Sequence, residues 1–289
     1  MSVQDKGNKI LISEELYDDF ISFFPKLKDD ILTHWTSRNL PEFPIDYYNQ
    51  LICENVLRGK HMRAQLFLLA SHYIFEEAPR ESKESFLGLA WIFEILQTAS
   101  IIGDDITDNS TMRRGQKCWH LNDHVKLIAV NDMVLLENIC FFLLKKYFST
   151  HPQYLNLVEA FHDSTLRLCI GQGLDLLAEN SIHPERFSMT LYEEIVNQKT
   201  AHFGFCLPIA SALILSGKSR GKLFEQIEKI ALNIGIMFQI HDDFIDIYGD
   251  PVKTGKVSTD ITNGKCAWPV VAALELSNST QRMALLVAF

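Results

Sequence analysis

Apolar residues recur at intervals of three and four positions along almost the whole chain, which is the period of an amphipathic helix. The pattern predicts helices over residues 11–36, 46–73, 84–107, 126–148, 153–178, 188–216 and 222–248, with a last helix from about residue 265. Pro25 is expected to bend or split the first helix, and Pro208 to kink the sixth between residues 204 and 208. We read no strand-like alternation, so the pattern predicts an all-α protein with residues 1–289 as a single domain.

The helix predicted over residues 84–107 is apolar on nearly every side, which is typical of a central helix that is packed all round. It ends in three acids, Asp104, Asp105 and Asp108. Asp104 and Asp108 are four positions apart and therefore lie one turn apart on one helical face, where like charges repel. Carboxylates in such an apolar setting need a wet cavity or a cation. The run therefore predicts a metal site.

A second acidic cluster, Asp242, Asp243 and Asp246, repeats this spacing at the end of the helix predicted over residues 222–248. One such cluster could equally be a solvated helix end, but two of them on two helices favour hard cations. Mg²⁺ prefers oxygen ligands and is usually held by one or two carboxylates together with water and phosphate.

Several basic residues lie before or after the two acidic clusters in the sequence. Any one of these basic residues alone would be interpreted as an ordinary surface charge. Lys60 and Arg63 are three apart and are expected on one helical face. Around two metal clusters such residues suit a diphosphate, to which Arg gives a bidentate contact and Lys a point charge. The full set is Lys60, Arg63, Arg113, Arg114, Lys199, Lys256 and Lys265.

Composition narrows the class of protein further. The chain is 47% hydrophobic and 22% charged, as in globular proteins, and its net charge of -9 argues against sequence-independent nucleic-acid binding. The six cysteines are scattered without a CxxC pair, which favours reduced thiols. The first ten residues lack a signal-peptide core, and no apolar run reaches the roughly 18 residues of a membrane span. We therefore expect a soluble, cytoplasmic protein.

These residues also carry a family resemblance. In order and spacing, from about residue 55 to residue 270, the chain resembles the trans-isoprenyl diphosphate synthases of the farnesyl diphosphate synthase type. The matching pieces are Gly59-Lys60-x-x-Arg63, Gln97, Asp104-Asp105-x-x-Asp108, Arg113-Arg114-Gly115-Gln116, Asn131-Asp132, Gln172-x-x-Asp175, Lys199-Thr200, Phe238-Gln239, Asp242-Asp243-x-x-Asp246, Thr254-Gly255-Lys256, Thr259-Asp260 and Lys265-Cys266-x-Trp268.

The resemblance implies a helical bundle around a central cavity (the isoprenoid synthase type), a homodimer and three Mg²⁺ ions in each active site. In such enzymes an allylic diphosphate ionises and isopentenyl diphosphate attacks the carbocation, giving a farnesyl-type or longer prenyl diphosphate. Asp104, Asp108 and Asp242 would bind Mg²⁺, with Asp105, Asp243 and Asp246 in support. The implied allylic diphosphate ligands are Arg113, Lys199, Gln239 and Lys256, of which the last three, with Thr200, are also the implied catalytic residues. The implied isopentenyl diphosphate ligands are Lys60, Arg63, Gln97 and Arg114, and Lys265 is a further substrate-binding residue.

The chain also departs from the family pattern. Ala99 and Ser100 stand just before the first aspartates, where bulky aromatic residues are usual, so we expect a deeper or wider cavity and a longer or coiled product. The alternative is that another side chain refills the space. The chain stops at Phe289, so it is expected to lack the family's last helices and basic tail.

Two other functions stay open at this point. A terpene synthase, which ionises and cyclises a prenyl diphosphate such as farnesyl diphosphate, would suit a widened pocket and a lost tail. Against it stands the complete set of residues implied for isopentenyl diphosphate. A non-catalytic partner subunit of a prenyl synthase is the third reading, and the two intact acidic clusters weigh against it.

Overall fold

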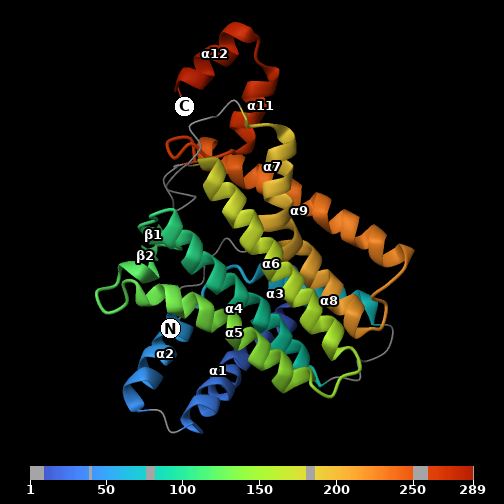
Figure 1. Ribbon diagram of the computed structural model, residues 1–289. Coiled ribbons are helices and arrows are strands. Elements are labelled where there is room, and N and C mark those ends of the chain that lie inside the picture. The colour runs from blue at the N-terminus through green and yellow to red at the C-terminus, as the bar shows by residue number, and fades with distance from the viewer. Residues whose placement is uncertain (1–9, 39–40, 76–81, 180–185, 250–259, 289) are drawn as a thin grey trace. The chain divides into compact units, whose positions relative to one another are not determined.

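The computed structural model describes residues 10–38, 41–75, 82–179, 186–249 and 260–288, and these residues are mostly helical (Figure 1). The all-α prediction is confirmed. The elements are α1 (Glu14–Thr36), α2 (Glu42–Asn55), α3 (Met62–Ile74), α4 (Lys83–Thr107), β1 (Met112–Arg113), β2 (Gln116–Lys117), η1 (Trp119–Leu121), α5 (Ile128–Phe148), α6 (Tyr154–Glu179), α7 (Met189–Val196), η3 (Asn197–Cys206), α8 (Leu207–Leu215), α9 (Lys222–Tyr248), α11 (Trp268–Leu276) and α12 (Ser279–Ala288).

The chain divides into two compact units. Unit 1 comprises Met1–Val158 and Ser211–Ser219, and unit 2 comprises Glu159–Ala210 and Arg220–Phe289. The first acidic cluster belongs to unit 1 and the second to unit 2. The expectation of one domain over residues 1–289 stays a prediction.

Helix α4 forms the centre of unit 1, as its all-round apolar sequence predicts. It packs against α1, α3 and α5, and Figure 1 shows α4 and α5 lying side by side. Trp91 on α4 is fully buried; its ring stacks on Phe20 at 4.3 Å, and its Nε1 donates to the Phe20 carbonyl at 2.8 Å. By length and composition α4 could cross a membrane, but 78% of its most apolar window is buried inside the protein. It is therefore a core helix.

The continuous helix predicted over residues 46–73 is wrong, because the chain breaks between α2 and α3. Gly59 has a φ of 140° and His61 a φ of 49°, and neither value is helical. The buried His61 ring supports the break, since Nδ1 pairs with the Tyr17 hydroxyl at 3.0 Å and Nε2 with the Leu57 carbonyl at 3.2 Å. Lys60 consequently precedes α3 and does not share a helical face with Arg63.

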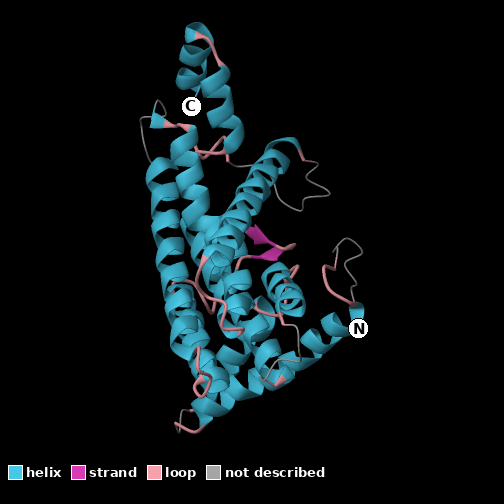
Figure 2. Ribbon diagram, turned by 90° about the vertical axis from the view of Figure 1, so that its right-hand side faces the viewer, coloured by secondary structure: helices cyan, strands magenta, loops and turns pink. Residues whose placement is uncertain are grey.

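A small antiparallel hairpin follows α4, where only a polar loop was expected (Figure 2). Its two-residue turn is Arg114–Gly115, and both residues have positive φ, at 53° and 72°. Positive φ at both central positions matches the twist of the flanking strands. The strands are two residues each, too short to show an alternating pattern in the sequence.

A buried carboxylate fixes the segment that follows the hairpin. Asp132 on α5 is fully buried and accepts hydrogen bonds from the Tyr47 hydroxyl at 2.5 Å and from Trp119 Nε1 at 2.8 Å. Donors from α2 and η1 thus compensate in part for the desolvation of a carboxylate on α5, whose pKa burial still raises. Asp132, which the sequence motif singled out, has a structural role here.

The expected helix over residues 188–216 is divided into α7, η3 and α8, of which α7 and η3 belong to unit 2 and α8 continues from unit 2 into unit 1. The segment η3 is a π-helix, and at its end the Leu207 N–H bonds to the His202 carbonyl, five residues back. Pro208 follows at once and has no N–H to continue the α-helical bonding at that point. The irregularity therefore lies mostly before the expected kink. Pro25, by contrast, is accommodated within a continuous α1.

Glycines allow the neighbouring helices to approach η3 closely. A Cβ at Gly171 on α6 would lie 2.2 Å from the backbone nitrogen of Lys199, and one at Gly235 on α9 would lie 2.4 Å from the Ala201 Cβ. These separations are far below van der Waals contact, so no larger residue fits without moving backbone. Lys199 is thereby held between packed helices.

The end of unit 2 contains two helices where one was predicted. Helix α11 buries Val271 and Leu274 against Tyr192 and Ile195 of α7. After a break, the Asn278 side chain accepts from the Gln281 N–H at 2.9 Å and so caps the start of α12.

The glycine pair Gly171 and Gly173 on α6 tests this packing. We expect Gly171→Ala to lower the free energy of unfolding by about 1–3 kcal/mol, because its Cβ must displace the η3 backbone. Gly173→Ala is the matched control, since a Cβ there meets nothing within 4 Å. It should stabilise the helix by up to about 1 kcal/mol. Equal effects of the two substitutions in urea unfolding would contradict the close approach.

Candidate active site

The first acidic cluster lies at the C-terminal end of α4. Asp105 is buried, at 3% exposed, whereas Asp104 and Asp108 are partly exposed. The Asp108 N–H donates to the Asp104 carbonyl at 2.9 Å, so the last turn is intact. The helix dipole is negative at this end and disfavours carboxylates. The cluster is therefore a place to which cations are drawn.

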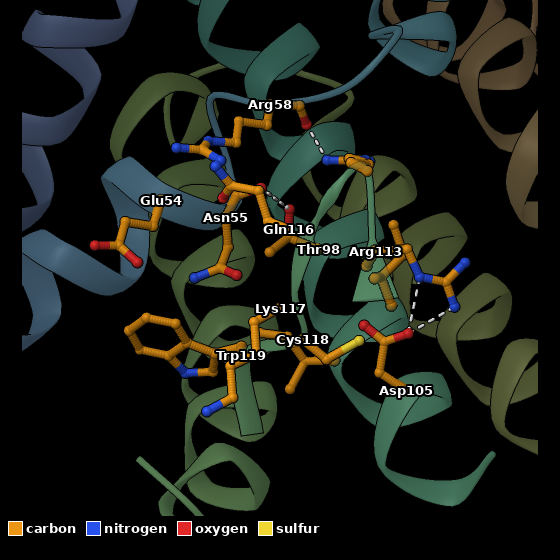
Figure 3. A pocket seen from close by; sticks show the side chains of 13 residues that line it. Glu54, Asn55, Arg58, Thr98, Asp105, Arg113, Gln116, Lys117, Cys118 and Trp119 are labelled. Carbon is orange, nitrogen blue, oxygen red and sulfur yellow. Dashed lines mark hydrogen bonds and ion pairs between the residues drawn. The ribbon is translucent and has the colours of Figure 1, made fainter. Parts of the chain in front are cut away.

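Arg113 supplies part of that positive charge from the hairpin (Figure 3). Its guanidinium lies 2.6 Å from Asp105 Oδ1 and 3.2 Å from Asp104 Oδ2. Burial raises the pKa of Asp105, an effect that Arg113 opposes. Burial would lower the pKa of Arg113, but the Asp105 and Asp104 carboxylates outweigh it and raise that pKa. Asp105 is thus held mainly by the protein, while Asp104 is the more accessible carboxylate.

A cavity of about 50 Å³ lies beside Asp105. Its wall includes Thr98 on α4 and the buried Cys118, whose thiol points at Asp105 (Figure 3). Burial, with the nearby Asp105 charge, raises the pKa of Cys118 to about 12, so the thiol is protonated at neutral pH. The space suits a few water molecules and is too small for a prenyl chain. The large cavity that the resemblance implies stays a prediction.

Two of the predicted diphosphate ligands in unit 1, Arg63 and Arg114, both feel the charge of Glu94. Arg114 donates to the Arg58 carbonyl, and its guanidinium lies over Gly59, where a Cβ would come within 2.8 Å of it. Arg63 at the start of α3 is partly buried, and burial together with the Arg114 charge lowers its pKa to about 10, against the opposing effect of Glu94. Lys60 is exposed in the preceding loop, and Gln97 is partly buried on α4.

In the second acidic cluster, too, one aspartate is accessible and the next is buried. Asp242 is exposed, whereas Asp243 and Asp246 are buried, at 5% and 6% exposed. Asp243 accepts from Gln239 Nε2 at 2.7 Å and from the backbone N–H of Trp268 at 2.9 Å. Burial raises the pKa of Asp243, and these bonds oppose that rise. In both clusters the first aspartate is accessible and the second is bound by the protein.

Hydrogen bonds join the predicted catalytic residues of unit 2 to this cluster. The Thr200 hydroxyl donates to Gln239 Oε1 at 2.9 Å, and Gln239 donates in turn to Asp243. Lys199 lies beside them in η3, with its Nζ 2.6 Å from Asp175 Oδ2. The π-helix, a form often found at functional sites, thus presents Lys199 and Thr200 together.

For the other predicted site residues, the structure gives fewer contacts. Lys256 lies outside the described residues. Lys265 is three residues before Trp268, and its N–H donates to the Asp260 carbonyl at 2.9 Å. Ala99 is buried, at 3% exposed, and the Ser100 hydroxyl donates back to the Leu96 carbonyl at 3.0 Å. Their role in shaping a product cavity stays a prediction.

The described residues contain no group of three or more His, Cys, Asp or Glu side chains that could enclose a metal ion. Magnesium does not require such a cage, since it commonly takes one or two carboxylates and completes its shell with water and phosphate oxygens. Asp104, Asp108 and Asp242 are oxygen donors with some exposure, so their chemistry fits that ion.

Three residues of this region had no role in the sequence interpretation. Asp175, which was noted only as part of a motif, pairs with Lys199. Gly171 permits the close approach of α6, and no sequence signal distinguishes it from Gly173. Glu94 is buried, its charge acts on Arg63 and Arg114, and it is the only charged residue in the apolar run from Phe86 to Ile102. That isolation could have revealed it.

The chain is similar to known proteins over most of its length. Residues 45–288 match the polyprenyl synthetase family. The chain is 38% identical to the farnesyl pyrophosphate synthase of Schizosaccharomyces pombe, covering 92% of this chain and 78% of that protein. It is 36% identical to the farnesyl pyrophosphate synthase of Homo sapiens, covering 96% of this chain and 67% of the human protein. A solved farnesyl diphosphate synthase of T. brucei, complexed with a bisphosphonate, has the same fold at 24% identity, with a TM-score of 0.86, covering 94% of this chain and 81% of that one. The chain therefore belongs to the polyprenyl synthetase family.

Proposed function

We propose that this protein is a magnesium-dependent prenyltransferase, which condenses isopentenyl diphosphate with an allylic diphosphate to give a farnesyl-type or longer prenyl diphosphate. One observation carries the proposal: at the ends of α4 and α9 alike, the leading aspartate is accessible while the next is held by the protein. Family membership and the farnesyl pyrophosphate synthases among its relatives support the same reaction class.

The proposed roles follow the accessibility of each carboxylate. Asp104, Asp108 and Asp242 would hold Mg²⁺, which when bound neutralises charge on the departing diphosphate. The buried Asp105, Asp243 and Asp246 would orient them. Three ions in each site and a cavity deepened at Ala99 and Ser100 belong to the same proposal.

Other residues would bind the substrates and handle the charge that develops. Lys199, Arg113, Gln239 and Lys256 would hold the allylic diphosphate while its carbon–oxygen bond breaks and negative charge grows on the leaving group. Thr200, through its dipole, would favour the carbocation. The isopentenyl double bond then forms the new carbon–carbon bond, and the proton that is lost passes to the released diphosphate. Lys265 would add positive charge near the second cluster.

We also propose that the protein works as a homodimer. At the start of α5, Leu127, Val130 and Val134 are 81%, 44% and 48% exposed, and they recur on one helical face. An exposed apolar stripe of this kind is typical of a protein interface, and a second copy of the chain brings the same stripe to the contact.

The reaction is tested by incubating the protein with Mg²⁺ and geranyl or farnesyl diphosphate, with and without labelled isopentenyl diphosphate. We expect label in a longer prenyl diphosphate. A volatile hydrocarbon or alcohol formed without isopentenyl diphosphate would instead identify a terpene synthase. Activity that appears only when another prenyl synthase is added would identify a partner subunit.

The metal assignment is tested by Asp104→Ala and Asp242→Ala, each assayed over a range of Mg²⁺ concentrations. Both variants should lose turnover by at least about 100-fold, because one electrostatic contact to a transition state contributes a factor of this order. Asp46→Ala, on an exposed face of α2, removes the same charge and should keep wild-type rates. Wild-type turnover in either cluster variant would refute the assignment.

The dimer is tested by Val134→Glu, which places a charge in the apolar stripe. The molar mass from light scattering should fall from twice that of the chain to that of one chain, because burying an unpaired charge in an interface is costly. Val287→Glu makes the same change at another exposed position, in α12, and should leave the mass unaltered. A monomeric wild-type protein would exclude the dimer.

A further inference from the structure

Glu94 is a buried acid that the proposed reaction leaves without a role. It lies on α4, ten residues before the first aspartate, and is 4% exposed. An ionised carboxylate is costly to bury unless donors or positive charges compensate for its lost hydration. What surrounds Glu94 therefore indicates what it does.

The first compensating group is the N-terminus of α3. Glu94 Oε1 accepts the backbone N–H of Ala64 at 3.1 Å, and Ala64 is fully buried. The residue at the N-cap position of α3 is His61, whose side chain makes no capping hydrogen bond because it pairs with Tyr17 and Leu57. Glu94 thus supplies from another helix the acceptor and the negative charge that a helix start favours.

The second compensating group is a pair of arginines. Arg63 directly precedes Ala64, whose N–H Glu94 accepts, and Arg114 donates to the Arg58 carbonyl in the loop before α3. Burial lowers the pKa of both arginines, the Arg114 charge lowers that of Arg63 further, and the Glu94 charge raises both. Arg63 comes from α3 and Arg114 from the hairpin turn, so a single carboxylate acts on two cations from separate segments. Without it, two partly desolvated guanidinium groups would repel each other.

We propose that Glu94 is a positioning residue for the homoallylic diphosphate, meaning that it keeps Arg63, Arg114 and the start of α3 preassembled as one anion site. This inference rests on the proposed function, because it takes isopentenyl diphosphate as the anion. Arg63 and Arg114 outnumber the one carboxylate that acts on both, so this group keeps a net positive charge. Glu94 therefore organises the site without cancelling its attraction for a diphosphate.

The proposal is testable because simple repulsion between Glu94 and a diphosphate predicts the opposite effect of neutralising Glu94. If Glu94 acted only as a negative charge near the ligand, its neutralisation would strengthen diphosphate binding. If it positions the arginines, its neutralisation lets them separate, and binding weakens even though the net positive charge rises. The sign of the change distinguishes the two.

The experiment compares steady-state kinetics of the wild type and Glu94→Gln, a variant that keeps the size of the side chain and an oxygen for the Ala64 N–H. We expect the KM for isopentenyl diphosphate to rise about tenfold or more, as for loss of one partner of a buried charge pair. The KM for the allylic diphosphate and kcat should stay within about threefold. Glu84→Gln removes the same charge from an exposed position on α4 and should change neither KM.

Two further measurements separate positioning from general stability. Glu94→Asp keeps the charge and should give a smaller rise in KM than Glu94→Gln; it also serves if Glu94→Gln does not fold. In an Arg114→Gln background the effect of Glu94→Gln should shrink, since the two residues act together. A fall in the isopentenyl diphosphate KM, equal rises in both KM values, or full additivity with Arg114→Gln would each overturn the inference.

Failure of the reaction itself is distinguished by calorimetric titration of isopentenyl diphosphate in the absence of allylic substrate. A wild-type protein that binds isopentenyl diphosphate without joining it to a prenyl chain would refute the proposed function alone, and weaker binding by Glu94→Gln would still support the role of Glu94. Equal binding by the two proteins would overturn that role.

Discussion

Both acidic clusters depend on one constraint: like charges are placed at helix ends whose dipoles disfavour them. Asp104, Asp105 and Asp108 close α4, and Asp242, Asp243 and Asp246 close α9, where the helix dipoles are negative. Each unit meets this cost in the same way: it buries the second carboxylate against donors and leaves the first accessible. Arg113 holds Asp105, and Gln239 with the Trp268 N–H holds Asp243. The remaining charge is available to the proposed Mg²⁺ ions.

Close backbone approaches and buried polar contacts keep these groups in place. Gly171 and Gly235 let α6 and α9 close on η3, so that Lys199 and Thr200 sit on a segment with little freedom to move. Asp132 performs a related task in unit 1, where Tyr47 and Trp119 converge on one of its oxygens. Such contacts stabilise only while complete, since a buried polar group that loses its partner costs about 1–3 kcal/mol.

The sequence predicted what depends on periodicity and failed where single residues govern the backbone. The bounds of helix α4 were predicted to within a residue because its apolar run is long. The acidic clusters were predicted because residues four positions apart lie on the same face of a helix. The break at Gly59 and His61 was missed, since the surrounding pattern remains helical and only their positive φ values interrupt it. The π-helix was missed because its hydrogen bonds depend on how α6 and α9 pack, which no local pattern records. Glu94 was missed because no other acid lies three or four positions from it, so no spacing pattern includes it.

Arg113 and Arg114 are neighbours in sequence but contact different parts of unit 1, the first the acidic end of α4 and the second the loop before α3. A turn with positive φ at Arg114 sends their side chains apart. Their Cα atoms are nevertheless about 3.8 Å apart, a distance that covalent geometry fixes. If each arginine receives one of two diphosphates, this Cα spacing limits how far apart the two ligands can lie, through the combined reach of the two side chains. Substitutions that loosen packing elsewhere can then weaken either contact, but they leave this spacing unchanged.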